Sequence, residues 1–372
     1  MNVLYIVSTL ERTGPTRQLL YLSTRVQDLG HRVCVLTLSP EPENSLKGMF
    51  VDRGLEVISL DLPRLKSLFV GRARLRQLLI GRAIDVVHTQ GVRADSLVSG
   101  VDPVVNRIAT LRNYPSDDYP PLYGKVKGWL MAWFHLRALA EFDRVAVVSG
   151  AIARLLEDYG KLPLDVLHNA VDSQYFRAPG LQERAESRNA LSLAPDSFVV
   201  VIVGDLIRRK RVPELLFALA RLVTPPEVLV VGDGPELDSC MRAVQGTDGV
   251  RFLGKREDVR PALWAADVLI SSSASEGMPN AVMEAVATGL PCLLSDIPAH
   301  RELIAAANTE IPEVLWFNLD NLEQGSPNQL ADGLQAVVAY WAQHPVRKCC
   351  DAFSVDSMAE KYCLLYAQGR QR

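Results

Sequence analysis

Two glutamates, Glu276 and Glu284, stand eight residues apart in a stretch that mixes serine, glycine and proline with apolar residues. Glu276 follows residues 267–270, which predict a strand, and serine, glycine and proline then interrupt regular structure. Glu284 falls in the early turns of a helix that the apolar spacing predicts for residues 280–288, ended by Gly289. Because ligands bind at the carboxyl ends of strands in an open parallel sheet, we expect both carboxylates to face one site.

The backbone between the two glutamates suits an anion. The amides of Gly277 and Met278, with the N-terminus of the following helix behind them, supply donors and a favourable dipole. Carboxylates accept hydrogen bonds from hydroxyl groups, so the pair suits a ligand with hydroxyls at both ends and a phosphate in the middle. A nucleotide-sugar has that form. On spacing alone, an exposed loop acid and a solvated helix residue remain the simpler interpretation.

A basic cluster follows residues 198–203, which predict another strand. It comprises a Gly-Asp pair and four cations, namely Gly204, Asp205, Arg208, Arg209, Lys210 and Arg211. Basic residues in a strand-to-helix loop supply the charge-assisted hydrogen bonds that a diphosphate requires. The alternative is a solvated run of surface charge.

In the amino-terminal half, the loop after the predicted strand at residues 3–7 contains a single glycine, Gly14. It lacks the Gly-x-Gly-x-x-Gly pattern, which counts against a dehydrogenase that binds a dinucleotide. Gly14 suits backbone contact with a ligand, and the alternative is that Gly14 and Pro15 simply begin the helix. His88 ends the predicted strand at residues 84–88 and is a further pocket candidate, although a lone histidine there is more often structural.

Arg112 and Asn113 follow the strand predicted for residues 104–111. An arginine at the end of a strand suits an anionic acceptor molecule. In the alternative interpretation, Arg112 pairs with Asp117 or Asp118.

The composition is that of an ordinary globular chain, and the length of 372 residues predicts two domains. Six cysteines without metal-ligand spacing indicate buried thiols in a reducing compartment. We expect neither a signal peptide nor a spanning helix, and hence a cytoplasmic protein. Residues 1–172 carry 21 Lys and Arg against 18 Asp and Glu, which hints at an anionic partner such as the inner face of a membrane. Nucleic acid is not expected, because no basic patch interleaved with aromatics occurs.

Two segments of the basic half are candidates for contact with a membrane. Residues 64–82 are rich in arginine and contain no acid, but we favour a surface helix packed on the sheet. Residues 122–142 predict a helix with four large side chains close together, Trp129, Met131, Trp133 and Phe134. We expect these side chains to lie in the core and the wall of a cleft, with binding at a membrane interface as the alternative.

Strand and helix patterns alternate along the whole chain, which predicts an α/β fold with parallel sheets. We expect two Rossmann-like domains that face each other across a cleft. The first comprises residues 1–172 and the second residues 173–350, with the polar segment 173–194 as a linker. Residues 351–372 contain an amphipathic helix.

The pattern Glu276-Gly277-x-Pro279, followed by Glu284-Ala285 and Gly289-x-Pro291, resembles the donor-site signature of the family four glycosyltransferases, a large retaining family with the GT-B fold. The resemblance covers nearly the whole chain. It implies that the amino-terminal domain binds the acceptor, that the carboxy-terminal domain binds the nucleotide-sugar, and that the last helix returns to the first domain.

The family also implies roles for individual residues. Lys210 and the neighbouring arginines would stabilise charge on the leaving diphosphate, Glu276 would hold the sugar, and Glu284 would bind ribose hydroxyls. The other residues that we predict to bind substrate are Gly14, Arg112, Asn113, Gly204, Arg208, Gly277, Met278, Pro279 and Asn280. No Asp-x-Asp motif occurs, so neither a metal nor another cofactor is expected.

Three positions depart from the family pattern. Asp205 replaces an arginine, the loop at Gly14 keeps only one of two glycines, and Arg112 and Asn113 stand where many members carry a histidine. The resemblance as a whole nevertheless implies a hexosyltransferase that acts with retention on a glycan or lipid-linked acceptor. The alternatives are a non-catalytic protein that binds a nucleotide-sugar and an epimerase of the same fold.

Overall fold

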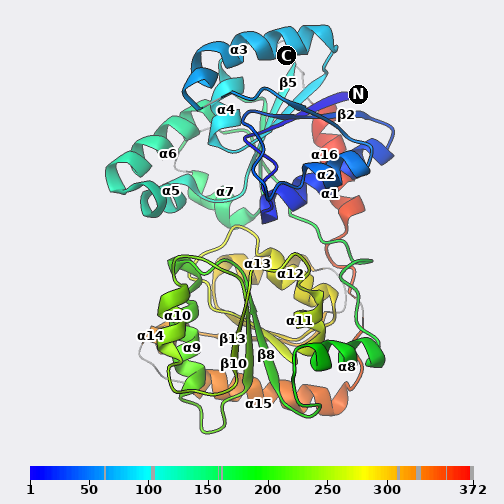
Figure 1. The fold of residues 1–372 in the computed structure, drawn as a ribbon. Helices are drawn as coiled ribbons and strands as arrows, with labels where there is room; N and C mark the ends of the chain where they lie inside the picture. Colours follow the sequence, from blue (N-terminus) through cyan, green and yellow to red (C-terminus); the bar gives the residue numbers. More distant parts are fainter. Residues whose placement is uncertain are drawn as a thin grey trace. The chain divides into compact units, whose positions relative to one another are not determined.

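The computed structural model describes residues 1–62, 64–101, 105–157, 159–160, 162–307, 311–323, 328–348 and 350–368. The chain forms two compact units (Figure 1). Unit 1 comprises Met1–Ala170 and Val355–Arg372, and unit 2 comprises Val171–Ser354. Each unit contains one parallel sheet with helices, as the alternation of patterns predicted.

Unit 1 is built on a seven-stranded sheet with the order β3-β2-β1-β4-β5-β6-β7. Its strands are β1 Asn2–Val7, β2 Arg32–Thr37, β3 Glu56–Ser59, β4 Val86–Gln90, β5 Asn106–Leu111, β6 Arg144–Val147 and β7 Leu164–Val166. Continuous apolar runs form the central strands because helices cover a parallel sheet on both faces. The strand order reverses between β1 and β4, and in such sheets a ligand-binding crevice opens at that point.

The helices of unit 1 are α1 Gly14–Asp28, α2 Lys47–Asp52, α3 Arg64–Gly81, α4 Val92–Ser99, α5 Pro115–Tyr123, α6 Lys125–Leu139, α7 Gly150–Glu157 and α16 Val355–Ala367. Although α16 comes last in the chain, it packs beside α1 (red in Figure 1). It contributes five buried side chains to the core of unit 1, Met358, Ala359, Tyr362, Leu365 and Tyr366. The predicted return of the last helix to the first domain is therefore confirmed.

Unit 2 has a six-stranded parallel sheet with the order β10-β9-β8-β11-β12-β13. The strands are β8 Val199–Val203, β9 Glu227–Val231, β10 Val250–Gly254, β11 Val268–Ser271, β12 Cys292–Ser295 and β13 Val314–Phe317. The helices are α8 Leu181–Ala190, α9 Val212–Ala220, α10 Leu237–Ala243, α11 Arg260–Ala265, α12 Asn280–Ala287, α13 Pro298–Ala306, α14 Leu319–Glu323 and α15 Asn328–Gln343, together with the 3-10 turn η1 Arg208–Lys210. The order reverses between β8 and β11, the two strands that precede the basic cluster and Glu276.

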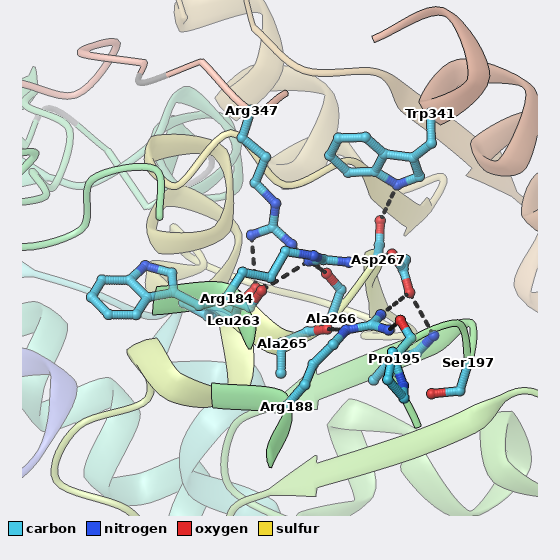
Figure 2. Close-up of polar contacts among 12 residues, drawn as sticks. Arg184, Arg188, Pro195, Ser197, Leu263, Ala265, Ala266, Asp267, Trp341 and Arg347 are labelled. Carbon is cyan, nitrogen blue, oxygen red and sulfur yellow. Dashed lines mark hydrogen bonds and ion pairs between the residues drawn. The ribbon is translucent and has the colours of Figure 1, made fainter. Parts of the chain in front are cut away.

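The prediction of a linker at residues 173–194 is wrong, because this segment contains α8, which packs against α11. Figure 2 shows how α8 is held. Arg184 and Arg188 each form an ion pair with Asp267, at 2.6 and 2.8 Å, and Asp267 also accepts a hydrogen bond from the Val199 amide. Arg347, which lies beyond α15, donates to the Leu263 carbonyl at the end of α11. Two arginines of this segment, the buried Arg188 and the partly buried Arg184, therefore hold α8 on the body of unit 2.

Among the described residues, none of the helices combines the length and the apolar character that crossing a membrane requires.

Candidate active site

Glu276 lies at the centre of a charged cluster in unit 2. Its two carboxylate oxygens accept hydrogen bonds from Lys210 Nζ at 2.5 Å and from Arg209 Nη1 at 2.8 Å. The Ser273 hydroxyl donates to the same carboxylate at 2.7 Å. The Glu276 side chain is 7% exposed, and burial opposes its ionisation. The charges of Lys210 and Arg209 outweigh burial and lower the pKa of Glu276 to about 2.

The backbone fastens the two loops of this cluster together. The Ser272 hydroxyl donates to the Lys210 carbonyl at 2.8 Å, and the Ala274 amide donates to the Arg209 carbonyl at 2.8 Å. Arg211 then adopts a left-handed conformation with φ of 51°, which ends the 3-10 turn before α9 begins. These contacts place Arg209 and Lys210 over the loop that follows β11.

Glycines allow the loop after β8, which begins at Gly204, to lie close to the loop after β9, which begins at Gly232. Gly232 has φ of 152°, and a Cβ atom at this position would lie 1.9 Å from the Gly204 carbonyl oxygen. A Cβ atom at Gly204 itself would lie 3.6 Å from Lys210 Cε, in ordinary contact. Close backbone approach therefore requires glycine at Gly232.

The charged residues Asp205 and Arg208 of the basic loop lie in different surroundings from Arg209 and Lys210. Asp205 is exposed, and so is Arg208. The carboxylate that pairs with Arg209 and Lys210 belongs to Glu276. The reversal of charge at Asp205 therefore leaves this ion-pair cluster intact.

The predicted helix after Glu276 is present as α12, which begins at Asn280 after Pro279. Glu284 lies in its second turn and is only 8% exposed. Gly277 and Met278 are also buried. Solvated surface acids are therefore the wrong description of both glutamates, whereas their contacts with a ligand stay a prediction.

His300 is a buried neighbour of the cluster that sequence reasoning did not assign to the site. Its Nδ1 atom donates to the Ser295 carbonyl at 2.8 Å, and its Nε2 atom lies 3.3 Å from the Ser271 hydroxyl. Burial lowers the pKa of His300. The neutral imidazole thereby connects the ends of β11 and β12 beneath the glutamate loop.

Unit 1 contains a pocket of about 270 Å³ at the carboxyl ends of β1, β4 and β5. Its walls include Arg112 and Asn113, as expected for a binding loop, together with Thr13 and Pro15. Gly14 is the first residue of α1, where the Thr13 hydroxyl accepts a hydrogen bond from the Thr16 amide at 3.4 Å. The local geometry thus matches the helix-start interpretation of Gly14, and its contact with substrate stays a prediction.

Arg112 donates to the side-chain oxygens of Asn169 at 2.5 Å and Gln90 at 3.1 Å. The alternative pairing with Asp117 or Asp118 is wrong. Both partners are neutral amides, so the guanidinium charge beside the pocket is not cancelled by them. An anionic group in the pocket would meet that charge.

His88 is a structural residue and not a pocket residue. It is fully buried, with Nδ1 at 2.7 Å from the Tyr366 hydroxyl and Nε2 at 2.7 Å from the Thr110 hydroxyl. Burial, and to a smaller extent the charge of Arg112, lowers the pKa of His88 to about 3. The neutral ring connects β4 and β5 to α16.

A second buried histidine reaches the pocket instead. His135 of α6 lies 2.6 Å from the Asp95 carboxylate of α4 and 2.8 Å from the Tyr119 hydroxyl of α5. His135 and Asp95 are each 1% exposed, and both His135 and Tyr119 line the pocket. Sequence analysis missed these residues because three separate helices supply them, and no local spacing connects them.

No group of three or more His, Cys, Asp or Glu residues in the described part of the chain is arranged to hold a metal ion. That the protein needs no metal stays a prediction.

Comparison with known proteins identifies the family. Residues 197–339 match the family profile described as glycosyl transferases group 1, and residues 13–170 match the profile described as a glycosyl transferase 4-like domain. The two matches cover separate parts of the chain that together form most of it. The chain belongs to this family of GT-B glycosyltransferases.

Two curated relatives and one solved structure illustrate the similarity. UDP-Gal:alpha-D-GlcNAc-diphosphoundecaprenol alpha-1,3-galactosyltransferase of Escherichia coli is 29% identical over 70% of this chain and 69% of its own. Alpha-monoglucosyldiacylglycerol synthase of Streptococcus pneumoniae is 23% identical over 79% of this chain and 70% of its own. The structure of Anabaena HepE with UDP and glucose has a TM-score of 0.80 at 17% identity, covering 99% of this chain and 100% of that protein. This last likeness confirms the GT-B fold.

Proposed function

We propose that this protein transfers a hexose, with retention, from a nucleotide-diphosphate sugar to a hydroxyl of a glycan or lipid-linked acceptor. The product would serve the synthesis of a cell-surface polysaccharide or glycolipid. The observation that carries the proposal is the cluster of the buried Glu276 carboxylate with the partly buried Lys210 and Arg209, which lies where the strand order of unit 2 reverses. In open α/β sheets this is the usual place for a nucleotide.

The chemistry of the cluster supports this proposal, because it can supply the two functions that such a donor requires. Lys210 and Arg209 would bind the diphosphate and stabilise the charge that develops on it as the sugar leaves. A bound diphosphate competes with Glu276 for these cations, so the carboxylate becomes available to the hydroxyls of the sugar. The N-terminus of α12, at Asn280, favours the same anion. Glu284 would bind the ribose.

The unit 1 pocket would hold the acceptor. Hydroxyl, amide and carboxylate groups line it and suit a sugar, and the charge of Arg112 suits a phosphate attached to that sugar. The Escherichia coli relative is named for a diphosphate-linked acceptor and a UDP-sugar donor. HepE has been solved with UDP and glucose. We infer a cytoplasmic location and peripheral contact with the membrane that carries such an acceptor.

The proposal is tested by incubating the protein with a panel of nucleotide-sugars and measuring nucleotide diphosphate release, with and without EDTA. Lipid-linked and water-soluble glycan acceptors are each added. We expect the protein to accept one nucleotide-sugar of the panel as its donor, and EDTA should not change the rate of nucleotide diphosphate release. Lys210→Ala should reduce turnover by about 10²- to 10³-fold, which is the typical loss when one hydrogen-bond donor to a developing negative charge is removed. Arg242→Ala, in the exposed α10 helix of unit 2, is the matched control.

Other outcomes identify the alternatives. Tight donor binding without turnover for any acceptor indicates a non-catalytic binding protein. Conversion of the donor into a different nucleotide-sugar indicates an epimerase. Absence of binding to every nucleotide-sugar refutes the donor site itself.

A further inference from the structure

The hairpin of α5 and α6 presents large apolar side chains to solvent over a short stretch of unit 1 (teal in Figure 1). We call this the hairpin surface. It consists of seven side chains that are 43–76% exposed, Leu122, Tyr123, Val126, Trp129, Leu130, Trp133 and Phe134. The expectation of a place in the core is therefore wrong for Trp129, Trp133 and Phe134, whereas a place in the wall of a cleft stays a prediction. So dense an apolar patch on the surface of a folded unit marks an interaction site.

Packing does not require these side chains, because α6 buries its opposite face. That face consists of small and medium residues, Gly128, Ala132, His135, Leu136 and Leu139. At Gly128 the helices approach so closely that a Cβ atom would lie 2.5 Å from Pro120 Cα. The helix thus packs through its small residues and directs its large aromatic residues outward, the reverse of an ordinary surface helix.

Within residues 119–140, which contain the hairpin surface, the charged side chains have one sign. Helix α6 contains Lys125, Lys127 and Arg137, and no Asp or Glu occurs from residue 119 to residue 140. Lys127 lies 5.8 Å from the ring centre of Tyr123, and Arg137 lies 5.8 Å from that of Trp133. Cations mixed with tryptophan and aliphatic residues are typical of segments that lie in the headgroup region of an anionic membrane.

The arginine-rich helix α3 fits this role less well. Arg72 donates to the Ser96 carbonyl, Arg74 donates to the Leu60 carbonyl, and Arg82 pairs with a glutamate of β3 at 2.6 Å. These guanidinium groups are already used to hold α3 on unit 1.

We propose that the hairpin surface docks on an anionic lipid bilayer, with α6 in the headgroup layer. The same hairpin supplies Tyr119 and His135 to the walls of the unit 1 pocket, and His135 is fixed to Asp95 at 2.6 Å. Docking therefore brings the pocket to the membrane surface, where the head of a lipid-borne acceptor reaches Arg112. The role of the pocket rests on the proposed function, whereas the docking does not.

The docking is tested by sedimentation of the full chain with vesicles of phosphatidylcholine alone or mixed with phosphatidylglycerol. We expect binding to the anionic vesicles, weakened by salt. Combined replacement of Trp129, Trp133 and Phe134 by serine should reduce the partition coefficient at least tenfold. Replacement of Phe217 and Val223, exposed apolar residues of unit 2, by serine is the matched control and should have no effect.

A second variant tests the electrostatic part. Lys125→Glu combined with Lys127→Glu should reduce binding to anionic vesicles by a similar factor. Failure of the wild type to bind these vesicles, or unchanged binding by the triple serine variant, overturns the proposal. A wild-type dimer that the serine substitutions dissociate would also overturn it and would assign the surface to a second copy of this chain. Light scattering measures this mass.

Turnover assays separate docking from catalysis. The triple serine variant should use a water-soluble acceptor as fast as the wild type does, but lose at least tenfold with an acceptor embedded in vesicles. Equal losses with both acceptors would count against docking. If the wild type transfers sugar to neither acceptor, the proposed function fails, and the sedimentation result still decides whether the hairpin docks.

Discussion

Glu276→Gln should separate nucleotide affinity from sugar transfer. In the wild type, burial disfavours the Glu276 carboxylate, but Lys210 and Arg209 outweigh burial and lower its pKa from 4.5 to about 2. That fall corresponds to about 3 kcal/mol of interaction in favour of the carboxylate. A diphosphate must replace this interaction when it binds the two cations, and in the variant it has less to replace.

The size of the effect follows from the same figure. If the whole interaction were recovered, UDP would bind the variant about 10²-fold more tightly. A glutamine oxygen still accepts a hydrogen bond from Lys210 or Arg209, so we expect a gain of about tenfold. The variant should also be less stable by up to about 3 kcal/mol without ligand, because two cations then lie together without their carboxylate.

The assay is calorimetric titration of UDP into wild type, Glu276→Gln and the control Asp238→Asn, an exposed acid of α10, at low and at moderate salt. The gain in affinity should be greatest at low salt. Transfer by Glu276→Gln should be at least 10²-fold slower, because in the proposed mechanism the Glu276 carboxylate holds the sugar in position. Weaker UDP binding by Glu276→Gln than by the control would refute the competition between carboxylate and diphosphate.

Three further outcomes are expected. Asp267→Asn should lower the free energy of unfolding by about 3 kcal/mol in urea titrations, because the buried Arg188 and the partly buried Arg184 lose their counter-charge. Asp296→Asn, in an exposed ion pair, should cost less than ~1 kcal/mol, and equal costs would contradict the role of burial. Gly232→Ala should lower the free energy of unfolding by at least ~2 kcal/mol and weaken UDP binding, because the Cβ atom of the alanine would clash with the Gly204 carbonyl. An unchanged melting temperature would contradict this prediction and show that the two loops can separate. The difference in free energy of unfolding between wild type and Glu276→Gln should be full above pH 4.5 and vanish as the pH falls towards 2, because a carboxyl with a lowered pKa loses its contribution to stability when it is protonated. A difference that stays constant across this pH range in unfolding experiments would argue against the ion pairs.

The local patterns of the sequence were sufficient for the architecture and for the position of the loops that contain Lys210 and Glu276. Apolar runs that alternate with helical spacing have one common solution, a parallel sheet covered by helices, and that solution places Glu276 and Lys210 after neighbouring strands. Their direct ion pair was not predictable, because it joins residues 66 apart in the sequence and depends on how two loops pack.

The errors arose where composition suggested exposure or burial. Residues 173–194 resemble a linker in composition, but Arg184 and Arg188 are held by Asp267, which is distant in sequence. The tryptophans of α6 suggest a core, but Gly128 and its small neighbours allow the closer approach to α5 and therefore form the packed face. A helical repeat shows that a helix has two faces, and tertiary packing decides which of them is buried.

The position of α16 has a consequence for synthesis on the ribosome. Unit 2 is one continuous segment and can complete its core as soon as residue 354 has emerged, whereas unit 1 lacks the α16 side chains until later. The part that is translated first is therefore finished last, which reverses the usual order in multidomain chains. A nascent chain cut after residue 170 would expose the apolar groove that α16 fills, and would depend on chaperones to avoid aggregation.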